Sequence, residues 1–420
     1  MAALSFDYVI VGAGIVGLTV ANELQRRHSH ARIAILDKEA MLGMHASGRN
    51  SGVLHSGIYY SSDTLKARVC AEGGRRMVEF AEEEQIPYSQ CGKLILATSE
   101  EQLPTVEKLL NNAKENRIPA ERMDRQQLRE IEPFAADGPA AIYCPTTAVI
   151  DALAVVKRLR EKLEQRGVTF LFDTKVLKRA GERGIETTQG VIRFAFLYNC
   201  AGAYADTVAK CFELADGYAL VPFKGIYWKL NEGANPKIKA NIYPVPDVSL
   251  PFLGVHLTRV ISGEVYVGPT AIPAFGRENY GKLNGIKAAE TLEIGLRLAG
   301  MYLKNNNNFR TMAHLETAKY RKRNFLIATQ RLVPSLKAED MVPTPKAGIR
   351  PQLVDTKTGK LEMDYIIEKN DNSIHVLNAI SPAFTSSFAF AERIVDEGEE
   401  KLNGMAEINH YGLKIHSLED

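Results

Sequence analysis

FDYVIVGAGIVGLTVANELQRR, residues 6–27, decides how the rest of the sequence is interpreted. The stretch starts as a short apolar run rich in β-forming residues, passes through three glycines and continues as an amphipathic run of helix-forming residues. Gly12, Gly14 and Gly17 fit the pattern GxGxxG at a strand-to-helix turn. Gly12 would permit the tight turn, Gly14 would let a pyrophosphate approach the backbone, and Gly17 would allow helix and strand to pack closely. Free N–H groups at the start of the helix would face the phosphates.

A second apolar strand, RIAILDKE at 32–39, follows the predicted helix. It ends at Asp37, twenty residues past Gly17, where a carboxylate can accept hydrogen bonds from the ribose hydroxyls of an adenosine. GxGxxG alone would be weak evidence, because a tight structural turn can have the same pattern. Here strand, glycines, helix, second strand and terminal acid occur in order, and together they predict a dinucleotide site.

The composition is that of a globular protein large enough for two domains, because one core seldom grows past about 250–300 residues. The 420 residues carry a formal net charge of +2, which predicts no nucleic-acid partner. The five cysteines are dispersed without metal-ligand spacing, which predicts reduced thiols in a cytoplasmic protein and no metal site. Without a signal-peptide pattern or an apolar run of about 20 residues, we expect no transmembrane segment. Peripheral contact with the inner face of the cell membrane is the alternative to a freely soluble chain.

After residue 39 the chain enters a loop rich in glycine and serine, where a simple NAD enzyme would continue with further βα units. GAGIVG with Asp37, TKV at 174–176 and NCAGAYAD at 199–206 resemble the FAD-dependent oxidoreductases of the D-amino-acid oxidase superfamily. Within it, several stretches are more similar to the L-2-hydroxyglutarate dehydrogenases and oxidases: NSGVLHSGIYY (50–60), LKARVCAEG (65–73), PFKGIYWKL (222–230), IYPVPD (242–247), PFLGVHLTR (251–259), AGIRPQL (347–353) and SPAFTSS (381–387). The resemblance extends over nearly the whole chain and implies FAD as the cofactor.

The resemblance implies an α/β fold, α+β overall, with a Rossmann-like FAD-binding domain and a discontinuous substrate domain built on a mainly antiparallel sheet. The FAD-binding domain is expected to comprise 1–85, 146–215 and 345–420, and the substrate domain 86–145 and 216–344. The residues themselves predict two strands in 167–180, a strand, turn and helix in 192–209, strands through 218–270, helices within 91–118, 123–133 and 284–304, two strands in 354–380, and a last helix at 384–402.

The resemblance also implies how the chain surrounds FAD. The loop 45–60 would run from the phosphates along the flavin, and its small residues would let the backbone lie against the ring. The backbone of Val176 would meet the adenine, and Gly202 would lie at a turn close to the flavin. SPAFTSS would begin the last helix, whose N-terminal amides would face the flavin pyrimidine; Ala383 stands there where the superfamily often has glycine. The residues implied to bind the cofactor are Gly12, Gly14, Ile15, Val16, Gly17, Asp37, Lys38, Ser47, Arg49, Asn50, Ser51, Gly52, Val176, Ala201, Gly202, Pro382, Ala383, Thr385 and Ser386.

Oxidation of a 2-hydroxy acid requires a group that takes the hydroxyl proton as the α-hydrogen leaves as hydride. A neutral imidazole suits this task near pH 7. The resemblance implies that His55 lies near the flavin N5, and His55 is therefore the first candidate for this base. Two alternatives stay open for His55: organising the site through hydrogen bonds without titrating, and covalent attachment of the flavin. His256, in PFLGVHLTR, is the rival base.

A dicarboxylate substrate requires cationic or strongly donating side chains, and arginine can bind both oxygens of a carboxylate. Arg350, in AGIRPQ, lies between small or turn-forming residues instead of on a charged helical face, which favours a carboxylate site over a surface position. Lys224, in PFKG, is the weaker candidate for the second carboxylate. Tyr60, Tyr227 and Tyr243 could donate phenolic hydrogen bonds. Because buried tyrosines more often pack with a satisfied hydroxyl, we expect at most two of the three in the site.

These features predict FAD-dependent oxidation of a 2-hydroxy acid, with L-2-hydroxyglutarate, giving 2-oxoglutarate, as the first candidate. The reduced flavin would pass its electrons to oxygen or to a quinone, between which the sequence does not decide. Two other activities of the superfamily stay open. An amino-acid or glycine-type oxidase needs no catalytic imidazole, and a glycerol-3-phosphate dehydrogenase would require a denser cluster of arginine and lysine. A non-catalytic FAD-binding protein is the alternative outside enzymes.

Overall fold

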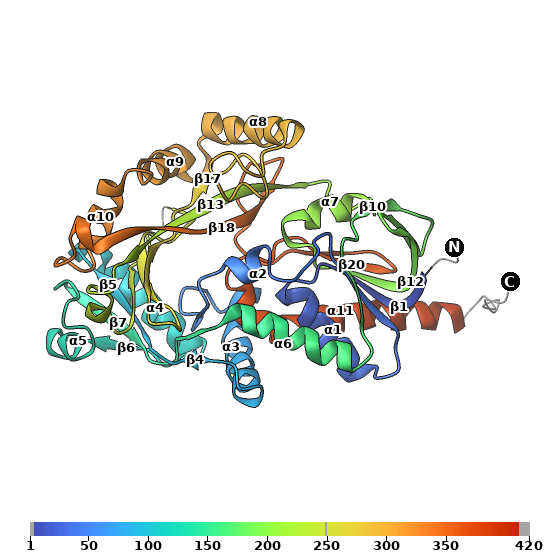
Figure 1. The fold of residues 1–420 in the computed structure, drawn as a ribbon, viewed down its shortest axis with the longest axis horizontal. Helices are drawn as coiled ribbons and strands as arrows, with labels where there is room; N and C mark the ends of the chain where they lie inside the picture. The colour runs from blue at the N-terminus through green and yellow to red at the C-terminus, as the bar shows by residue number, and fades with distance from the viewer. Residues whose placement is uncertain (1–3, 248–249, 411–420) are drawn as a thin grey trace.

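The computed structural model describes residues 4–247 and 250–410, which form two lobes, each built around its own sheet (Figure 1). An eight-stranded sheet lies in the first lobe and a nine-stranded sheet in the second. A small three-stranded sheet of β3 (Val53–Leu54), β4 (Tyr88–Ser89) and β8 (Ala148–Ile150) accompanies them. Within the described residues, no helix is long and apolar enough to cross a membrane.

The first sheet has β1 (Leu4–Val11) at its centre. β1 lies parallel to β2 (Ile33–Leu36) on one side and to β12 (Gly190–Asn199) on the other, and β12 lies parallel to β20 (Ser373–Val376). The carboxyl ends of β1, β12 and β20 therefore meet at one edge, which is where open α/β sheets bind their ligands. The other strands of this sheet are β9 (Thr169–Leu171), β10 (Val176–Arg179), β11 (Gly184–Thr187) and β19 (Ile367–Lys369).

The helix that follows the glycines, α1 (Ile15–Arg27), is almost wholly buried. It contacts β1 and β2 as well as α6 (Ala152–Gln165) and the last helix, α11 (Ala383–His410). Because several sides of α1 are covered, its polar residues Thr19, Glu23 and Gln25 are buried along with its apolar ones. The other helices of this lobe are α2 (Ala46–Arg49), α3 (Leu65–Glu83), α7 (Ala205–Lys210) and the 3-10 turn η2 (Gly202–Tyr204).

The second sheet is mainly antiparallel. Its longest ladder pairs β13 (Tyr218–Leu230) with β18 (Met341–Asp355) and places Phe223 opposite Arg350. The other strands of the sheet are β5 (Lys93–Ala97), β6 (Glu121–Met123), β7 (Ala140–Cys144), β14 (Asn241–Pro244), β15 (His256–Arg259), β16 (Val265–Gly268) and β17 (Ile272–Pro273). The remaining helices and 3-10 turns are η1 (Glu100–Gln102), α4 (Leu103–Glu115), α5 (Arg125–Ile131), η3 (Asn235–Lys237), α8 (Ala288–Lys304), η4 (Asn306–Asn308), α9 (Phe309–Ala318), α10 (Lys322–Gln330) and η5 (Ala338–Asp340).

The mixed α/β fold predicted from the sequence is confirmed, with differences at element ends. The expected domain boundary at residue 345 falls inside β18, which stays in the second sheet to Asp355 because it pairs with β13 over its whole length. A division by sheets therefore places this boundary after Asp355; the rest of the domain division stays a prediction. The last helix begins at Ala383, one residue before the expected start, and extends to His410.

The predicted turn between β1 and α1 has the geometry that its glycines require. Gly12 has a φ of +108°, a backbone conformation that L side chains rarely adopt. A Cβ atom on Gly17 would lie 2.0 Å from the carbonyl oxygen of Gly12. Both positions therefore need glycine for the chain to pass from strand to helix in so few residues.

A second close approach, which the sequence did not predict, joins α3 to the first turn of α11. A Cβ atom on Gly73, in α3, would lie between 2.6 and 2.8 Å from backbone atoms of Ser386. Backbone atoms cannot rotate away as a flexible side chain can. Gly73 therefore sets the distance between α3 and the start of α11.

We expect Gly73→Ala to lower the free energy of unfolding by about 1–3 kcal/mol, because overpacking of this size forces backbone shifts. Urea unfolding of the FAD-loaded protein measures this change. The variant should also bind FAD more weakly, because the start of α11 would have to move.

Gly295→Ala, in α8, is the matched control. It is also a helical glycine, but nothing lies within 4 Å of its added Cβ atom. This variant should be neutral or raise the free energy of unfolding by about 0.5–1 kcal/mol, because alanine favours helix. Equal effects at the two positions would contradict the role given to Gly73.

Candidate active site

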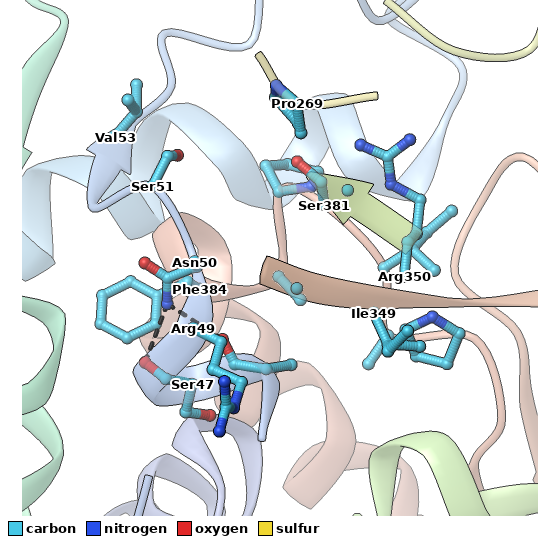
Figure 2. Close-up of a pocket in the computed structure, with 18 of the residues that line it drawn as sticks. Ser47, Arg49, Asn50, Ser51, Val53, Pro269, Ile349, Arg350, Ser381 and Phe384 are labelled. Atoms are coloured by element: carbon cyan, nitrogen blue, oxygen red, sulfur yellow. Dashed lines mark hydrogen bonds between the residues drawn. The ribbon is translucent and has the colours of Figure 1, made fainter. Parts of the chain in front are cut away.

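A cavity lies where the carboxyl ends of the first sheet meet the second sheet (Figure 2). Its lining comes from the start of α1, the loop 46–55, strands β13 and β18, and the start of α11. In Figure 2, Ile349 and Arg350 lie across the cavity from Ser47 and Arg49. None of the described lining residues is Asp or Glu, whereas two are arginines. The cavity therefore favours an anionic ligand.

The end of the cavity at α1 is suited to phosphates. Gly14 is the N-cap of α1 and offers no side-chain cap, so the first turn keeps donors for a ligand. One donor is taken, since the N–H of Ile15 donates to Ser47 Oγ at 2.9 Å. Asp37 Oδ2 accepts from the N–H of Ala13 at 2.8 Å, and Asp37 Oδ1 accepts from the N–H of Glu39 at 2.9 Å. Asp37 therefore holds the turn in place, and its contact with a ribose stays a prediction.

The start of α11 forms another part of the wall. Residues 381–385 all line the cavity. Thr385 Oγ1 accepts from the N–H of His55 at 3.1 Å and donates to the carbonyl oxygen of Val53 at 3.3 Å. The loop that carries His55 is thereby tied to the first turn of α11. The positive end of this helix dipole adds to that of α1 at the same cavity.

These features fit FAD. The uncapped start of α1 can receive a pyrophosphate, the small residues of loop 46–53 leave room beside the backbone, and the start of α11 can face a developing negative charge. The residues of the predicted cofactor site that line this cavity are Gly14, Ile15, Val16, Ser47, Arg49, Asn50, Ser51, Gly202, Pro382, Ala383 and Thr385. Those that lie outside the lining are Gly12, Gly17, Asp37, Lys38, Gly52, Val176, Ala201 and Ser386.

Lys38 is bound within the protein. Its Nζ donates to Glu278 at 2.7 Å and to Glu39, and it lies 3.1 Å from Nε2 of His45. Glu39, His45 and Glu278 are close enough to one another to hold a metal ion, but the ammonium of Lys38 already pairs with both carboxylates. A direct contact of Lys38 with the cofactor would require these bonds to break.

Both candidate bases line the cavity and are neutral at physiological pH. Burial, aided by the nearby charges of Lys93 and Arg350, lowers the pKa of His55 to about 3. Burial likewise lowers the pKa of His256 to about 4. A hydrogen bond to Gly254 raises this pKa, but burial has the larger effect. Nδ1 of His256 lies 2.9 Å from the carbonyl oxygen of Gly254. A carbonyl only accepts, so Nδ1 carries the proton and Nε2 keeps a free lone pair.

Arg350 is a cation without an internal partner. Among the described residues, its guanidinium makes no ion pair or hydrogen bond, and it lies 4.8 Å from the ring centroid of Phe252. Burial lowers its pKa, but arginine stays charged in proteins. Figure 2 shows the side chain at the cavity wall opposite α2. An unpaired cation in an acid-free cavity is suited to bind an anion.

The structure separates the other predicted substrate residues. Tyr227 and Tyr243 line the cavity, whereas Tyr60 does not. Lys224 lies outside the lining as well, and its Nζ donates to the carbonyl oxygen of Gly281 at 2.8 Å and to Asn279 Oδ1 at 3.1 Å. These contacts give no support to Lys224 as a carboxylate ligand.

The alternation of β13 explains where Lys224 points. Phe223, Gly225 and Tyr227 line the cavity, so the side chain between the first two lies on the other face of the strand. This period of two was visible in PFKGIYWKL. Phe223 and Thr270, which also line the cavity, were missed because an apolar strand residue and a loop threonine carry no distinctive sequence signal.

A dinucleotide-binding lobe that shares its cavity with a second, antiparallel sheet has the architecture of a dinucleotide-dependent oxidoreductase. The chain belongs to the family of FAD dependent oxidoreductases, whose model matches residues 7–397. FAD is accordingly its cofactor, as the sequence predicted.

Relatives of this chain support the family assignment, and solved structures share its fold. The chain is 37% identical over 402 residues to the L-2-hydroxyglutarate dehydrogenase of Indibacter alkaliphilus, covering 94% of this chain and 98% of that protein. It is 35% identical to the mitochondrial L-2-hydroxyglutarate dehydrogenase of Homo sapiens, covering 94% and 89%. Its fold is similar to that of the L-alpha-glycerophosphate oxidase of Mycoplasma pneumoniae with FAD bound, with a TM-score of 0.75 at 21% identity and 95% of each chain covered. The glycine oxidase of Geobacillus kaustophilus gives a TM-score of 0.70 at 19% identity, again with 95% of each chain covered.

The neutral histidines predict how stability depends on pH. Between about pH 4 and pH 6.5, the unfolded chain binds protons on His55 and His256 that the folded protein excludes. The free energy of unfolding therefore falls as the pH decreases through this range, by about 1 kcal/mol per pH unit for each histidine. His55→Gln and His256→Gln should each make this slope shallower, as measured by urea unfolding of the FAD-loaded protein at pH 5 to 7.

His30→Gln is the control, because His30 is exposed in a loop. It should leave the slope of stability against pH unchanged. Unaltered slopes for both His55→Gln and His256→Gln would show that these imidazoles are protonated in the folded protein.

Proposed function

We propose that this protein oxidises L-2-hydroxyglutarate to 2-oxoglutarate with FAD as its cofactor. The observation that carries the proposal is the unpaired Arg350 in the same acid-free cavity as two neutral imidazoles. A 2-hydroxy acid presents a carboxylate to the cation and a hydroxyl proton to the base. The names of the relatives, at 35–37% identity over most of both chains, support the choice of this hydroxy acid.

FAD would be held by the two helix starts. The N–H groups at the start of α1, with Ser47 and Arg49, would bind the pyrophosphate. The N–H groups at the start of α11 would face the flavin pyrimidine. When bound there, FAD supplies a two-electron acceptor beside the substrate carbon.

Arg350 would bind the carboxylate next to the reacting carbon. Its planar guanidinium can bind both carboxylate oxygens at once, which fixes the orientation of the hydroxyl-bearing carbon. Tyr227 lines the same cavity, and burial raises its pKa to about 12, so its hydroxyl stays protonated as a donor. These residues bind and orient the substrate without themselves exchanging protons.

One of the two imidazoles would take the hydroxyl proton. His256 has Nε2 free, and its ring stacks on that of Tyr243 at a centroid distance of 3.9 Å. His55 is held through its backbone N–H by Thr385, and its ring makes no hydrogen bond among the described residues. Both rings are neutral before the substrate binds, as a base must be. His55 stays the first candidate because its loop is tied to the start of α11, where the flavin pyrimidine would lie.

The alternatives within the superfamily fit this cavity less well. A glycerol phosphate carries two negative charges on one phosphate and would require several cations around it, but the cations of the described lining are Arg49 and Arg350. An amine substrate can lose its proton to solvent before it binds, so it would leave the neutral imidazoles of His55 and His256 without a proton to accept.

L-2-Hydroxyglutarate should bleach the oxidised flavin of the protein under anaerobic conditions, and the D-enantiomer should not. Arg350→Gln should lower kcat/KM for the L-enantiomer by about 30-fold or more, because the carboxylate loses a buried charged partner. Stopped-flow measurement of flavin absorbance follows both effects.

Arg193→Gln, which alters an exposed arginine of β12, is the control and should leave the kinetics unchanged. Flavin that stays oxidised with both enantiomers would contradict the proposed substrate. Glycine, other amino acids and glycerol 3-phosphate would then be tested in the same way.

We further propose that the protein works in the cytoplasm and contacts an anionic membrane surface through α8, where a quinone would accept the electrons. Leu292, Leu296 and Leu303 lie on one outward face of α8 and are 66%, 67% and 73% exposed. Figure 1 places α8 at the edge of the second lobe. Residues 275–331 contain eleven Lys or Arg and four Asp or Glu, although the whole chain has 52 against 50. Exposed leucines within a segment that has excess positive charge are typical of surfaces that bind anionic lipid.

The protein should therefore sediment with vesicles that contain phosphatidylglycerol and should not with vesicles of phosphatidylcholine alone. Leu292→Ser/Leu296→Ser should abolish this binding while the rate of flavin reduction is retained. Leu177→Ser/Val191→Ser, at exposed apolar residues of the first lobe, is the control and should bind normally. If the protein binds neither kind of vesicle, the proposed membrane contact is contradicted. Oxygen would then be tested as the electron acceptor by measuring its consumption during turnover.

A further inference from the structure

Lys93 is a lysine buried in the second sheet without a counter-ion. Its side chain is fully buried, and its Nζ has no hydrogen-bond partner and no ion pair among the described residues. The ammonium lies 4.6 Å from the ring centroid of Tyr59 and 5.5 Å from that of Tyr243. Such cation–π contacts compensate only part of the desolvation of an ion. An anion beside Lys93 would compensate this desolvation and favour the charged form of its amine.

The sheet register places Lys93 next to the cavity. β5 lies parallel to β14, with Ile95 opposite Tyr243. Side chains two residues apart on a strand lie on the same face of the sheet, so Lys93 and Ile95 share a face. Tyr243 is paired with Ile95 on the neighbouring strand, and its side chain therefore lies on that face too. Tyr243 itself lines the cavity. The ammonium therefore lies directly behind one side chain of the cavity wall.

The position of Lys93 also relates it to the candidate bases. Besides burial, the charges of Lys93 and Arg350 both contribute to lowering the pKa of His55 and of His256. Each imidazole is therefore within electrostatic reach of both cations. Burial lowers the pKa of Lys93 itself. Cys144 and Cys70 are the ionisable groups that act on it in the opposite direction, and no carboxylate does.

We infer that Lys93 and the hydroxyl of Tyr59 form the subsite for the second carboxylate of a dicarboxylate substrate. This inference rests on the proposed function, because it takes the first carboxylate to be the one at Arg350. The long stem of lysine lets its ammonium turn toward the cavity when an anion enters. Tyr59 Oη is buried without a partner, and burial raises the pKa of Tyr59 well above its usual value, so the phenol can donate to the same anion. The subsite would distinguish dicarboxylates from monocarboxylates. Lys93 would thus bind the second carboxylate, which the sequence had assigned to Lys224.

Lys93→Met tests the subsite, because methionine has nearly the same length and no charge. The variant should lose about 30-fold or more in kcat/KM for L-2-hydroxyglutarate, as expected for a buried charge partner. It should lose less than about threefold for L-2-hydroxyvalerate, which has no second carboxylate. Calorimetric titration with glutarate, which has two carboxylates and no hydroxyl to oxidise, should show the same weakening without any turnover.

Lys66→Met is the matched control, because Lys66 is also buried but its ammonium already donates to the carbonyl oxygen of Met363. Any loss that it causes should be equal for the two hydroxy acids. Urea unfolding should find Lys93→Met at least as stable as the unaltered protein, because an unpaired buried charge is removed.

An equal loss for both hydroxy acids in Lys93→Met, or unchanged affinity for glutarate, would overturn the subsite. If the unaltered protein oxidises neither hydroxy acid, the proposed function fails instead. The glutarate titration still tests Lys93 in that case, because binding of a dicarboxylate needs no oxidation.

Discussion

Positive charge without an internal counter-charge dominates the cavity between the two sheets. The starts of α1 and α11, the guanidinium of Arg350 and the ammonium of Lys93 all lie at or beside it, and none of its described lining residues is acidic. Burial is the main cause of the protonation states around this cavity. It lowers the pKa of His55 and of His256, so both are neutral, and it raises the pKa of Tyr227 and of Tyr243, so both keep their protons. The unliganded protein therefore has a cavity in which an anion removes electrostatic strain instead of adding it.

The architecture maintains this arrangement by connecting the two sheets at several points. β18 carries Arg350 and is held along its length by β13, so the position of the cation is fixed by a long antiparallel ladder. Thr385, in the first turn of α11, binds the loop that carries His55. Gly73 allows α3 to support the same turn from behind. Cation, base and helix start thus come from distant parts of the sequence and are held by independent backbone contacts, which preorganises the site.

The sequence predicts those features that require a local pattern of residues. The turn after β1 was predicted because only glycine allows its φ angle and its close approach, and the strand, helix and strand around it follow ordinary apolar periodicity. Arg350 was singled out because of its small neighbours, and the structure places it at the cavity wall without a partner. Lys224 was selected by its neighbours in the same way, but the alternation of β13 directs it to Gly281. Composition around a residue is therefore a weaker guide than the face of the strand on which it lies.

The sequence by itself determined the dinucleotide-binding unit, because this unit depends on a short contiguous stretch whose geometry few other residues permit. The mixed α/β fold and FAD as the cofactor were implied by the resemblance of the whole sequence to a known family. Only the tertiary structure decided which cations have partners. Lys93, Lys38 and Lys224 look alike in the sequence, yet Lys38 pairs with two glutamates, Lys224 binds Gly281 and Lys93 has no partner among the described residues. The difference arises from strand register and from the packing of distant segments, neither of which a local pattern records.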